Sequence, residues 1–283
     1  MKLGRFEIDS FVEQHFRLDG GSMFGVIPKT MWQKLIPADE NNLIPMVTNI
    51  FVVKTEEKII LFDIGLGDTL TEREMKVYGT DGVSHMGEGL RSCGVTENDV
   101  DYVILTHLHT DHAGGAVRMQ NGDYVPRFPK ARYVVHRGEW ESAMNPDERT
   151  GAVYVPARLQ ALEDAGQIDF IDRDTEIVAG IRAVRTGGHT SAHFALEIES
   201  EGRLCLYYAD IFPTSAHLRI PFVPATDLYP LESMEIKRRE LPRIVDTGVV
   251  LAFDHDTRMP FGKVRRDGTN LIVEAVDSKV GVH

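Results

Sequence analysis

The chain has 283 residues, of which 42% are hydrophobic and 26% are charged, and its formal net charge is −12 at pH 7. This composition is ordinary for a soluble globular protein, and no apolar run approaches the roughly eighteen residues of a membrane span. The net negative charge argues against a nucleic-acid partner, because a protein normally binds phosphates through a basic patch on its surface. The only dense basic run, residues 237–239, is expected on the solvated face of a helix.

No linker, repeat or low-complexity tract divides the chain, so we expect one domain over residues 1–283. The first residues lack the apolar core of a signal peptide. The two cysteines, Cys93 and Cys205, lie far apart and match no metal-ligand spacing. Isolated thiols suit a reducing compartment, so we expect a cytoplasmic protein.

The first half of the chain predicts strands with one helix before the most polar segment. Residues 55–57 are expected to form a hairpin turn, and the helix is expected to end at Gly94. The apolar run 102–105 is typical of a buried strand. The other predicted elements are strands at 6–11, 46–53 and 58–62 and a helix at 83–93.

The second half alternates strands and helices, which predicts an α/β fold with layers of sheet and helices outside. Four strands are expected between residues 176 and 250, with a helix at 233–246. The elements expected before them are a strand at 132–136, a helix near 138–144, a loop at 145–151, a helix near 156–165 and a strand at 167–171.

A short segment after the 102–105 strand carries His107, His109, Asp111 and His112. Ligands in α/β folds sit at such strand ends, and imidazole and carboxylate suit zinc, iron or manganese. Extended residues alternate sides, so His107 and His109 can face one metal. Asp111 and His112, just before an expected helix from residue 113 onward, can face a second metal. A chance His-rich surface loop is the alternative, disfavoured because the chain has only 11 histidines.

Three further side chains follow apolar strands later in the chain. Singly, each is typical of a cap or a turn. Together they add two imidazoles and one carboxylate, which would complete a two-metal site. They are His189, Asp210 and His255.

The H-x-H-x-D-H motif with its later His, Asp and His resembles the metallo-β-lactamase superfamily, over about residues 59–255. The resemblance implies a four-layer αββα sandwich with two metals at one edge of the sheets. It also implies that Asp63 and His193 orient the site without binding metal. The implied ligands are His107, His109 and His189 for the first metal, Asp111, His112 and His255 for the second, and Asp210 as the bridge.

Two metals about 3.5–4 Å apart can share a water and lower its pKa to roughly 7. The expected reaction is therefore hydrolysis by a metal-bridging hydroxide, without a Ser or Cys nucleophile. Asp111 and Asp210 are the candidates for steering the proton to the leaving group. Zinc is the expected metal, and the same ligands accept iron, manganese or cobalt.

Segments 19–28, 78–79 and 209–214 resemble quorum-quenching N-acyl homoserine lactonases and methyl parathion hydrolase-like members of the superfamily. The implied substrate is a small-molecule lactone whose ester ring is opened. The alternative on the same site is an organophosphate triester or an aryl ester. Such lactonases carry a Tyr where this chain has Pro213, so His217 or Tyr229 would have to replace that group, or the mechanism omits it.

Two other functions remain open from the sequence alone. A metal-binding regulator that kept the fold without catalysis is disfavoured because all seven ligand positions are filled. A nuclease is disfavoured by the negative charge and by the lack of an evident basic recognition arm.

An apolar segment early in the chain, which includes Met23, Phe24 and Trp32, has two interpretations. It could be a flap that holds an acyl chain or aryl group, since ligand pockets are mostly apolar. It could equally be a loop packed on the core. His217 is expected near the substrate, and the resemblance implies that the early segment can contribute to a homodimer interface.

Overall fold

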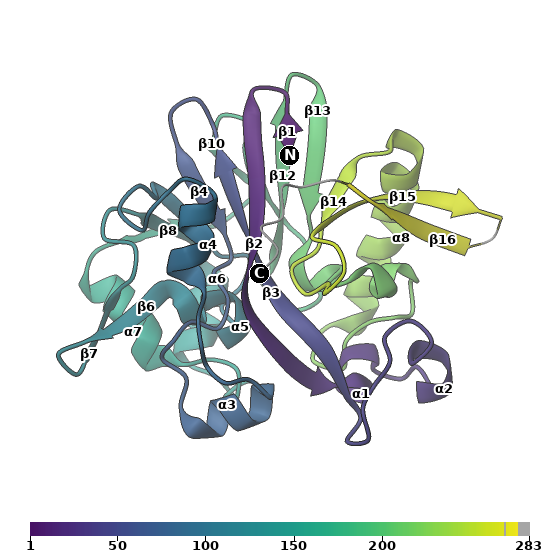
Figure 1. Ribbon diagram of the computed structural model, residues 1–283, viewed down its shortest axis with the longest axis horizontal. Helices are drawn as coiled ribbons and strands as arrows, with labels where there is room; N and C mark the ends of the chain where they lie inside the picture. The colour runs from purple at the N-terminus through teal and green to yellow at the C-terminus, as the bar shows by residue number, and fades with distance from the viewer. Residues whose placement is uncertain (269, 277–283) are drawn as a thin grey trace.

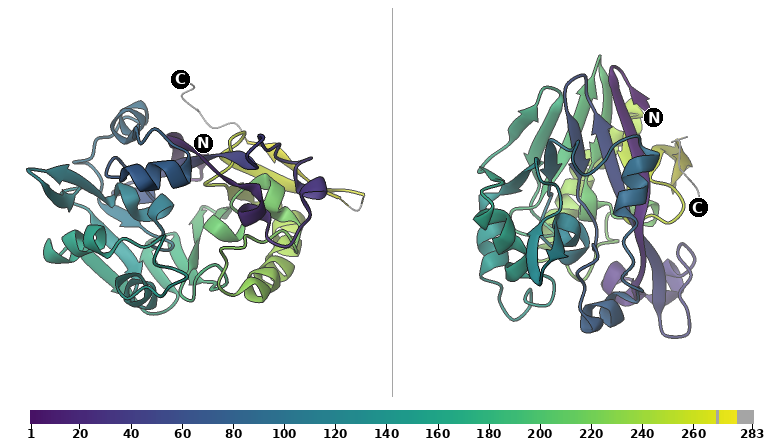
Figure 2. Two further views of the ribbon diagram at one scale, coloured as in Figure 1. Left: turned by 90° about the horizontal axis from the view of Figure 1, so that it is seen from below. Right: turned by 60° about the vertical axis from the view of Figure 1, so that its left-hand side comes forward.

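The computed structural model describes residues 1–268 and 270–276 and contains two seven-stranded sheets packed face to face (Figure 1). The first sheet has the order β1-β2-β3-β4-β5-β8-β9 and the second runs β10 to β16 in sequence order. Views from two other directions place the helices outside the sheets (Figure 2). The predicted αββα sandwich is therefore confirmed.

The strands of the first sheet are β1 (Lys2–Leu3), β2 (Phe6–Asp19), β3 (Leu43–Lys54), β4 (Ile59–Phe62), β5 (Tyr102–Ile104), β8 (Arg132–His136) and β9 (Ile168–Ile171). Those of the second are β10 (Thr175–Val178), β11 (Ile181–Arg185), β12 (Phe194–Ser200), β13 (Arg203–Tyr207), β14 (Val250–Ala252), β15 (Phe261–Asp267) and β16 (Asn270–Ala275). A separate hairpin pairs β6 (Val117–Gln120) with β7 (Asp123–Pro126).

The helices fall at the outer faces and in the connections. On the side of the first sheet lie α3 (Glu72–Tyr78), α4 (Met86–Ser92), α6 (Arg137–Met144) and α7 (Pro156–Asp164), and α8 (Pro230–Thr247) covers the second sheet (Figure 1). Short helices are α1 (Gly20–Phe24), α2 (Lys29–Trp32) and α5 (Thr110–Ala113), with 3-10 turns at Gly114–Ala116, Ala209–Ile211 and Ser215–Leu218. In the part of the chain that the structure describes, no helix has the length and apolar character to cross a membrane.

Alternating side chains on the central strands feed different hydrophobic cores. In β3, Phe51 and Val53 join the core between the sheets, whereas Val52 joins the core under α4, α6 and α7. In β13, Tyr207 faces the other sheet and Leu206 faces α8. Because side chains alternate across a strand, strands buried on both faces read as nearly continuous apolar runs.

Several expectations about the elements need correction. Strand β2 extends to Asp19, beyond the predicted end at residue 11, because Glu13 and Gln14 interrupt the apolar pattern although both are buried. A bulge between Val12 and Gln14 accommodates them. Five strands, not four, occur between residues 175 and 252. Helix α3, the β6–β7 hairpin and the β15–β16 hairpin were not predicted.

Two polar segments also differ from expectation. The helix after the metal motif begins at Thr110 rather than at residue 113, so Asp111 and His112 lie in its first turn. The basic run is not simply a solvated face, because Lys237 is fully buried. Its ammonium donates hydrogen bonds to the carbonyl oxygens of His217 (2.8 Å) and Phe222 (2.6 Å).

Candidate metal centre

Strand direction brings polar residues together at one edge of the sandwich. Strands β4, β5, β8 and β9 are mutually parallel, as are β13 and β14. Their carboxyl ends therefore lie at a common edge in each sheet, where α/β folds bind ligands. The residues that follow β4, β5, β11, β13 and β14 at this edge are Asp63, His107, His189, Asp210 and His255.

Asp63, which follows β4 in the first sheet, accepts hydrogen bonds from several residues at this edge. Its carboxylate accepts hydrogen bonds from Thr106 N (2.8 Å), Thr106 Oγ1 (2.8 Å) and Tyr207 Oη (2.6 Å). The Nδ1 of His112 lies 3.0 Å away. Since a carboxylate can only accept, that nitrogen carries the proton and the Nε2 lone pair of His112 is left free. These bonds also hold Asp63 at a φ of 41°, which is unfavourable for a residue with a Cβ.

Two other histidines are oriented in the same way. His189 Nδ1 lies 2.7 Å from Asp227 Oδ1, and His255 Nδ1 lies 2.9 Å from the carbonyl oxygen of Val47. Both partners only accept, so both histidines carry a proton on Nδ1, and in the neutral form that binds metal they present the lone pair of Nε2. Such outer hydrogen bonds fix the tautomer and ring plane of metal-binding histidines.

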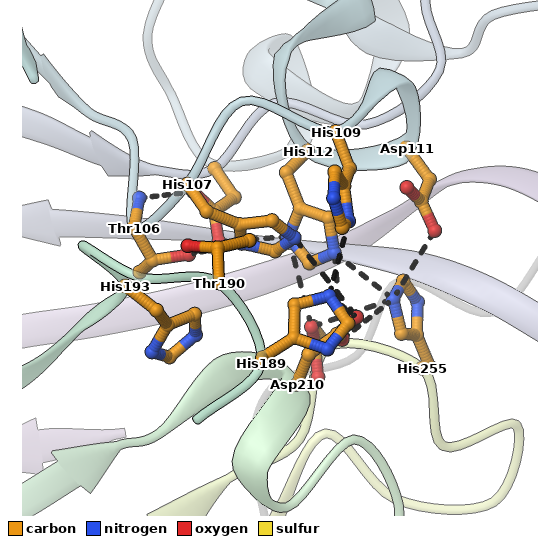
Figure 3. Close-up of polar contacts among 12 residues, drawn as sticks. Thr106, His107, His109, Asp111, His112, His189, Thr190, His193, Asp210 and His255 are labelled. Carbon is orange, nitrogen blue, oxygen red and sulfur yellow. Dashed lines mark hydrogen bonds and ion pairs between the residues drawn. The ribbon is translucent and has the colours of Figure 1, made fainter. Parts of the chain in front are cut away.

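The free nitrogens converge on Asp210 (Figure 3). One oxygen, Oδ2, lies 3.0 Å from His189 Nε2 and 4.0 Å from His107 Nε2. The other, Oδ1, lies 3.4 Å from His112 Nε2 and 3.3 Å from His255 Nε2. Ala209, at a φ of 43°, supports the turn that presents this carboxylate. Asp210 therefore offers a different oxygen to each set of histidines.

Contacts between these side chains fit a cation better than hydrogen bonds. His112 Nε2 and His255 Nε2 are 3.3 Å apart, although each presents a lone pair. That spacing matches the edge of a tetrahedron about 3.4 Å long, which bonds of 2.0–2.1 Å to zinc produce. Among the described residues, His107 Nε2 and Asp210 Oδ1 have no hydrogen-bond partner. The donor set thus fits divalent cations.

Two groups of side chains have ligand atoms within 4.8 Å of one another. They share Asp210 and contain six of the seven predicted ligands. Asp111 is outside both groups, with its Oδ2 3.6 Å from His255 Nε2 (Figure 3). The second group instead contains Asp254, which the sequence analysis did not select. The groups are His107, His109, His189 and Asp210, and His112, Asp210, Asp254 and His255.

Burial and charge set the protonation of the centre. Burial lowers the pKa of His107 and of His109 well below the usual value. Burial opposes protonation of His189 too, but the Asp210 carboxylate raises its pKa to about 10. The pKa of Asp210 is held well below its usual range by His189 and His112 against the effect of burial. Metal binding requires neutral imidazoles, so cations would replace these protons as the charge that balances Asp210.

A buried carboxylate that the sequence analysis missed connects two ligand loops. Glu139, in α6, accepts hydrogen bonds from Leu108 N (3.1 Å), Thr190 Oγ1 (2.6 Å) and Tyr154 Oη (2.7 Å). Leu108 lies between two histidines of the first group, and Thr190 follows His189. No sequence pattern indicates this role, because Glu139 resembles any polar residue of an amphipathic helix.

His193 lies beside the centre. Its ring centroid is 5.2 Å from that of His107 and 5.9 Å from that of His189. Its Nδ1 contacts Thr186 Oγ1 at 2.6 Å, and it belongs to neither ligand group. Its predicted supporting role stays a prediction.

The four residues predicted to contact substrate pack against one another. Phe24 stacks on Trp32 at 5.3 Å and on His217 at 4.5 Å. His217 Nε2 donates to Met23 O at 2.8 Å, and its Nδ1 contacts Thr214 Oγ1 at 2.8 Å. Both ring nitrogens are thus engaged, so His217 is not poised to donate a proton to substrate. All four side chains are buried, which matches the packed-loop interpretation, and substrate contact stays a prediction.

Phe16 connects this cluster to the centre, because its ring packs edge-on against His255 at 5.4 Å. A small cavity of 80 Å³ also reaches His255. Much of its wall is apolar, and its lining includes Leu35, Ile36, Pro37, Pro45 and Thr214. Tyr229, the other candidate for the missing Tyr, is 45% exposed.

Known proteins are similar to this chain in sequence. The model of the metallo-β-lactamase superfamily matches residues 43–255. An N-acyl homoserine lactonase of Bacillus cereus is 27% identical over 243 residues, which cover 78% of this chain and 86% of that protein. One from Bacillus sp. is 30% identical over 161 residues, and the match spans only 58% of that relative's length.

Solved structures are also similar to this chain. A Staphylococcus aureus protein described as a probable metal-dependent hydrolase has a TM-score of 0.91 and 32% identity, covering 98% of this chain and 99% of its own. AidC, described as a dizinc quorum-quenching lactonase, has a TM-score of 0.81 at 21% identity, covering 98% and 96%. The family match spans most of the chain and includes all seven predicted ligand positions. The chain therefore belongs to the metallo-β-lactamase superfamily.

Proposed function

We propose that this protein is a dinuclear metal-dependent hydrolase that opens the ester ring of lactones, with N-acyl homoserine lactones as the substrate class. The position of Asp210 carries this proposal. Its two oxygens face two separate sets of histidine nitrogens, at 3.0 Å from His189 and 3.3 Å from His255. The names of the Bacillus relatives support the substrate class.

The proposed ligands are those of the sequence analysis. His107, His109 and His189 would hold one cation, and Asp111, His112 and His255 the other, with Asp210 between them. Bound there, two divalent cations, with zinc the expected ion, would activate water and polarise an ester carbonyl. This chemistry needs no side-chain nucleophile.

The chain's own groups would then control orientation and protons. Asp63 and Asp227 hold His112 and His189 in the tautomers that ligation needs. Asp111 is our candidate for passing a proton to the leaving alkoxide, because its side chain is 12% exposed and lies at the rim beside His255. Packing of Phe16 on His255 would keep bulk water from that side.

A substrate panel on metal-reconstituted protein tests the proposal. We expect ring opening of acyl homoserine lactones, seen as proton release and as a product one water heavier. Phosphotriesters and aryl esters test the alternative substrate class with the same enzyme. Protein that turns over nitrophenyl phosphotriesters but no lactone would contradict the lactone assignment.

The Asp210→Asn variant tests the centre itself. We expect kcat to fall by roughly 10²–10³-fold, because the variant loses the charge shared between both sets of histidines. Metal analysis of the same samples should find two ions per chain in the wild type and fewer in the variant. An unchanged kcat would show that Asp210 does not bridge.

A further inference from the structure

Asp254 is held beside the second group of ligands by its backbone. Asp254 lies two residues after the end of β14 and directly precedes His255. Asn49 donates its backbone N–H to Asp254 O at 2.7 Å, and its side-chain amide donates to the carbonyl oxygens of Phe253 (2.9 Å) and Asp256 (3.0 Å). Three hydrogen bonds from one residue thus fix the backbone of this turn, from which the Asp254 side chain projects.

The Asp254 carboxylate is buried without a donor. The residue is 2% exposed, and neither side-chain oxygen has a hydrogen-bond partner among the described residues. Asp63 is 3% exposed, yet its carboxylate has donors from Thr106, His112 and Tyr207. A buried carboxylate that lacks any donor is costly unless a cation compensates it.

The neighbouring histidines cannot supply the missing donor. Asp254 Oδ2 lies 3.5 Å from His255 Nε2 and 3.8 Å from His112 Nδ1. His255 has its proton on Nδ1, toward Val47, and the Nδ1 proton of His112 points to Asp63. With neutral imidazoles, Asp254 therefore faces a lone pair on His255 and an N–H of His112 that is already engaged by Asp63, and it receives a hydrogen bond from neither ring.

We propose that Asp254 is an additional ligand of the second cation, beside His112, Asp210 and His255. This inference rests on the proposed two-cation centre but not on its substrate. The second position would then combine two imidazoles with carboxylates from Asp210, Asp254 and Asp111, whereas the first combines three imidazoles with Asp210 alone. Oxygen-rich sites suit manganese and other harder ions better than imidazole-rich sites do. The two positions thus differ in metal preference.

Metal titration of the metal-free protein tests the assignment without any substrate. For Asp254→Asn, which keeps the shape and loses the charge, we expect binding of one cation to weaken by more than roughly 100-fold, beyond the 10–100-fold loss typical of outer hydrogen-bonding partners. The other cation should bind within about threefold of the wild type, and the affinity of the weakened position for Mn²⁺ should fall more than its affinity for Zn²⁺. The visible spectrum of Co²⁺ at that position should change with its coordination number.

Two further variants show which cation position is affected and whether loss of any buried carboxylate has the same effect. His109→Ala should weaken the other cation, so combining it with Asp254→Asn identifies the position affected. Asp9→Asn removes a buried carboxylate that is paired with Lys54 at 3.1 Å, and it should leave both affinities unchanged. Metal-free Asp254→Asn should unfold at the same or higher urea concentration than the metal-free wild type, because the variant replaces a buried carboxylate that has no hydrogen-bond donor among the described residues.

The results distinguish this inference from the proposed function. Two tightly bound cations in both the wild type and Asp254→Asn would overturn the role of Asp254 and leave the hydrolase intact. Loss of metal-free stability with unchanged affinity would assign Asp254 a purely structural role and overturn the inference too. A wild type that binds fewer than two cations would overturn the two-cation centre and this ligand with it.

Discussion

His189 donates its Nδ1 proton to Asp227 at 2.7 Å, and Asp227 in turn accepts the hydroxyl of Ser233 at 2.5 Å. Ser233 belongs to α8, so a helix on the outer face of the second sheet helps to orient His189, a proposed metal ligand at the edge of the sandwich. Lys237 lies one turn further on the same helix and holds the loop of His217 and Phe222.

Removing Asp227 should therefore weaken metal binding although Asp227 is not among the proposed ligands. For Asp227→Ala we expect a loss of roughly 10–100-fold in affinity for the first cation, because His189 loses its fixed tautomer. Competition with a coloured chelator measures this loss. Ser233→Ala should have a smaller effect in the same direction, and equal affinities in all three proteins would contradict the role given to Asp227.

Replacing Glu139 should loosen the contact between the two loops that carry the first ligand group. Glu139→Ala removes an ionic acceptor from three donors and should reduce the free energy of unfolding by at least about 2 kcal/mol. Glu139→Gln keeps an acceptor oxygen, so its free energy of unfolding should lie between those of the wild type and Glu139→Ala. Urea unfolding of the metal-free proteins is the measurement, and an alanine variant as stable as the wild type would refute this prediction.

The buried Lys237 should make stability depend on pH on the alkaline side. Burial lowers the pKa of Lys237 to about 7, against the opposing effect of Asp227, from 10.5 in the unfolded chain. Between these two values the unfolded chain binds more protons than the folded one, so folding becomes more favourable as pH rises from 7 toward 10.5. Urea midpoints at pH 7 and pH 9.5 measure this change.

Lys237→Met provides the control for that pH dependence. The variant should lose the Lys237 contribution to the rise in stability between these pH values. At pH 9.5 it should also be less stable than the wild type by about 1–3 kcal/mol, because the carbonyl oxygens of His217 and Phe222 lose their donor. An identical pH slope in both proteins would show that Lys237 stays charged when buried.

Phe24 and Trp32 provide the test of the early segment. If it acts as a flap for an acyl chain, Phe24→Ala and Trp32→Ala should raise KM for long-chain lactones more than for short ones. If the residues only pack, both variants should lose about 3–5 kcal/mol of stability with equal effects on all chain lengths. Kinetics at several chain lengths together with urea unfolding decide between the two.

The edge of the sandwich was predictable because its residues follow apolar strands, and strand ends are visible in the pattern of residues. His107, His189 and His255 could be placed in this way. The supporting residues were not visible, because Asp227 and Glu139 act through contacts between segments far apart in the chain. Their residue types are common on any protein surface.

The misjudged elements have a similar cause. The end of β2 was placed too early because a buried Glu13 looks like a solvent-exposed residue. Phe24 and Trp32 have the composition of a ligand pocket, but apolar side chains beside a site also serve as its packing. Only the three-dimensional arrangement distinguishes these two uses.

Each ligand group takes members from both halves of the sandwich, since His107 and His112 follow β5 in one sheet while Asp210 and His255 follow strands of the other. Neither half alone presents a complete set. A metal ion can bind to a complete set only after the two halves have packed together, and it would then hold them together at one end. Metal binding would thus be a late step in folding. Removing the metal with a chelator should make amide hydrogens at this end of the protein exchange before those at the opposite end.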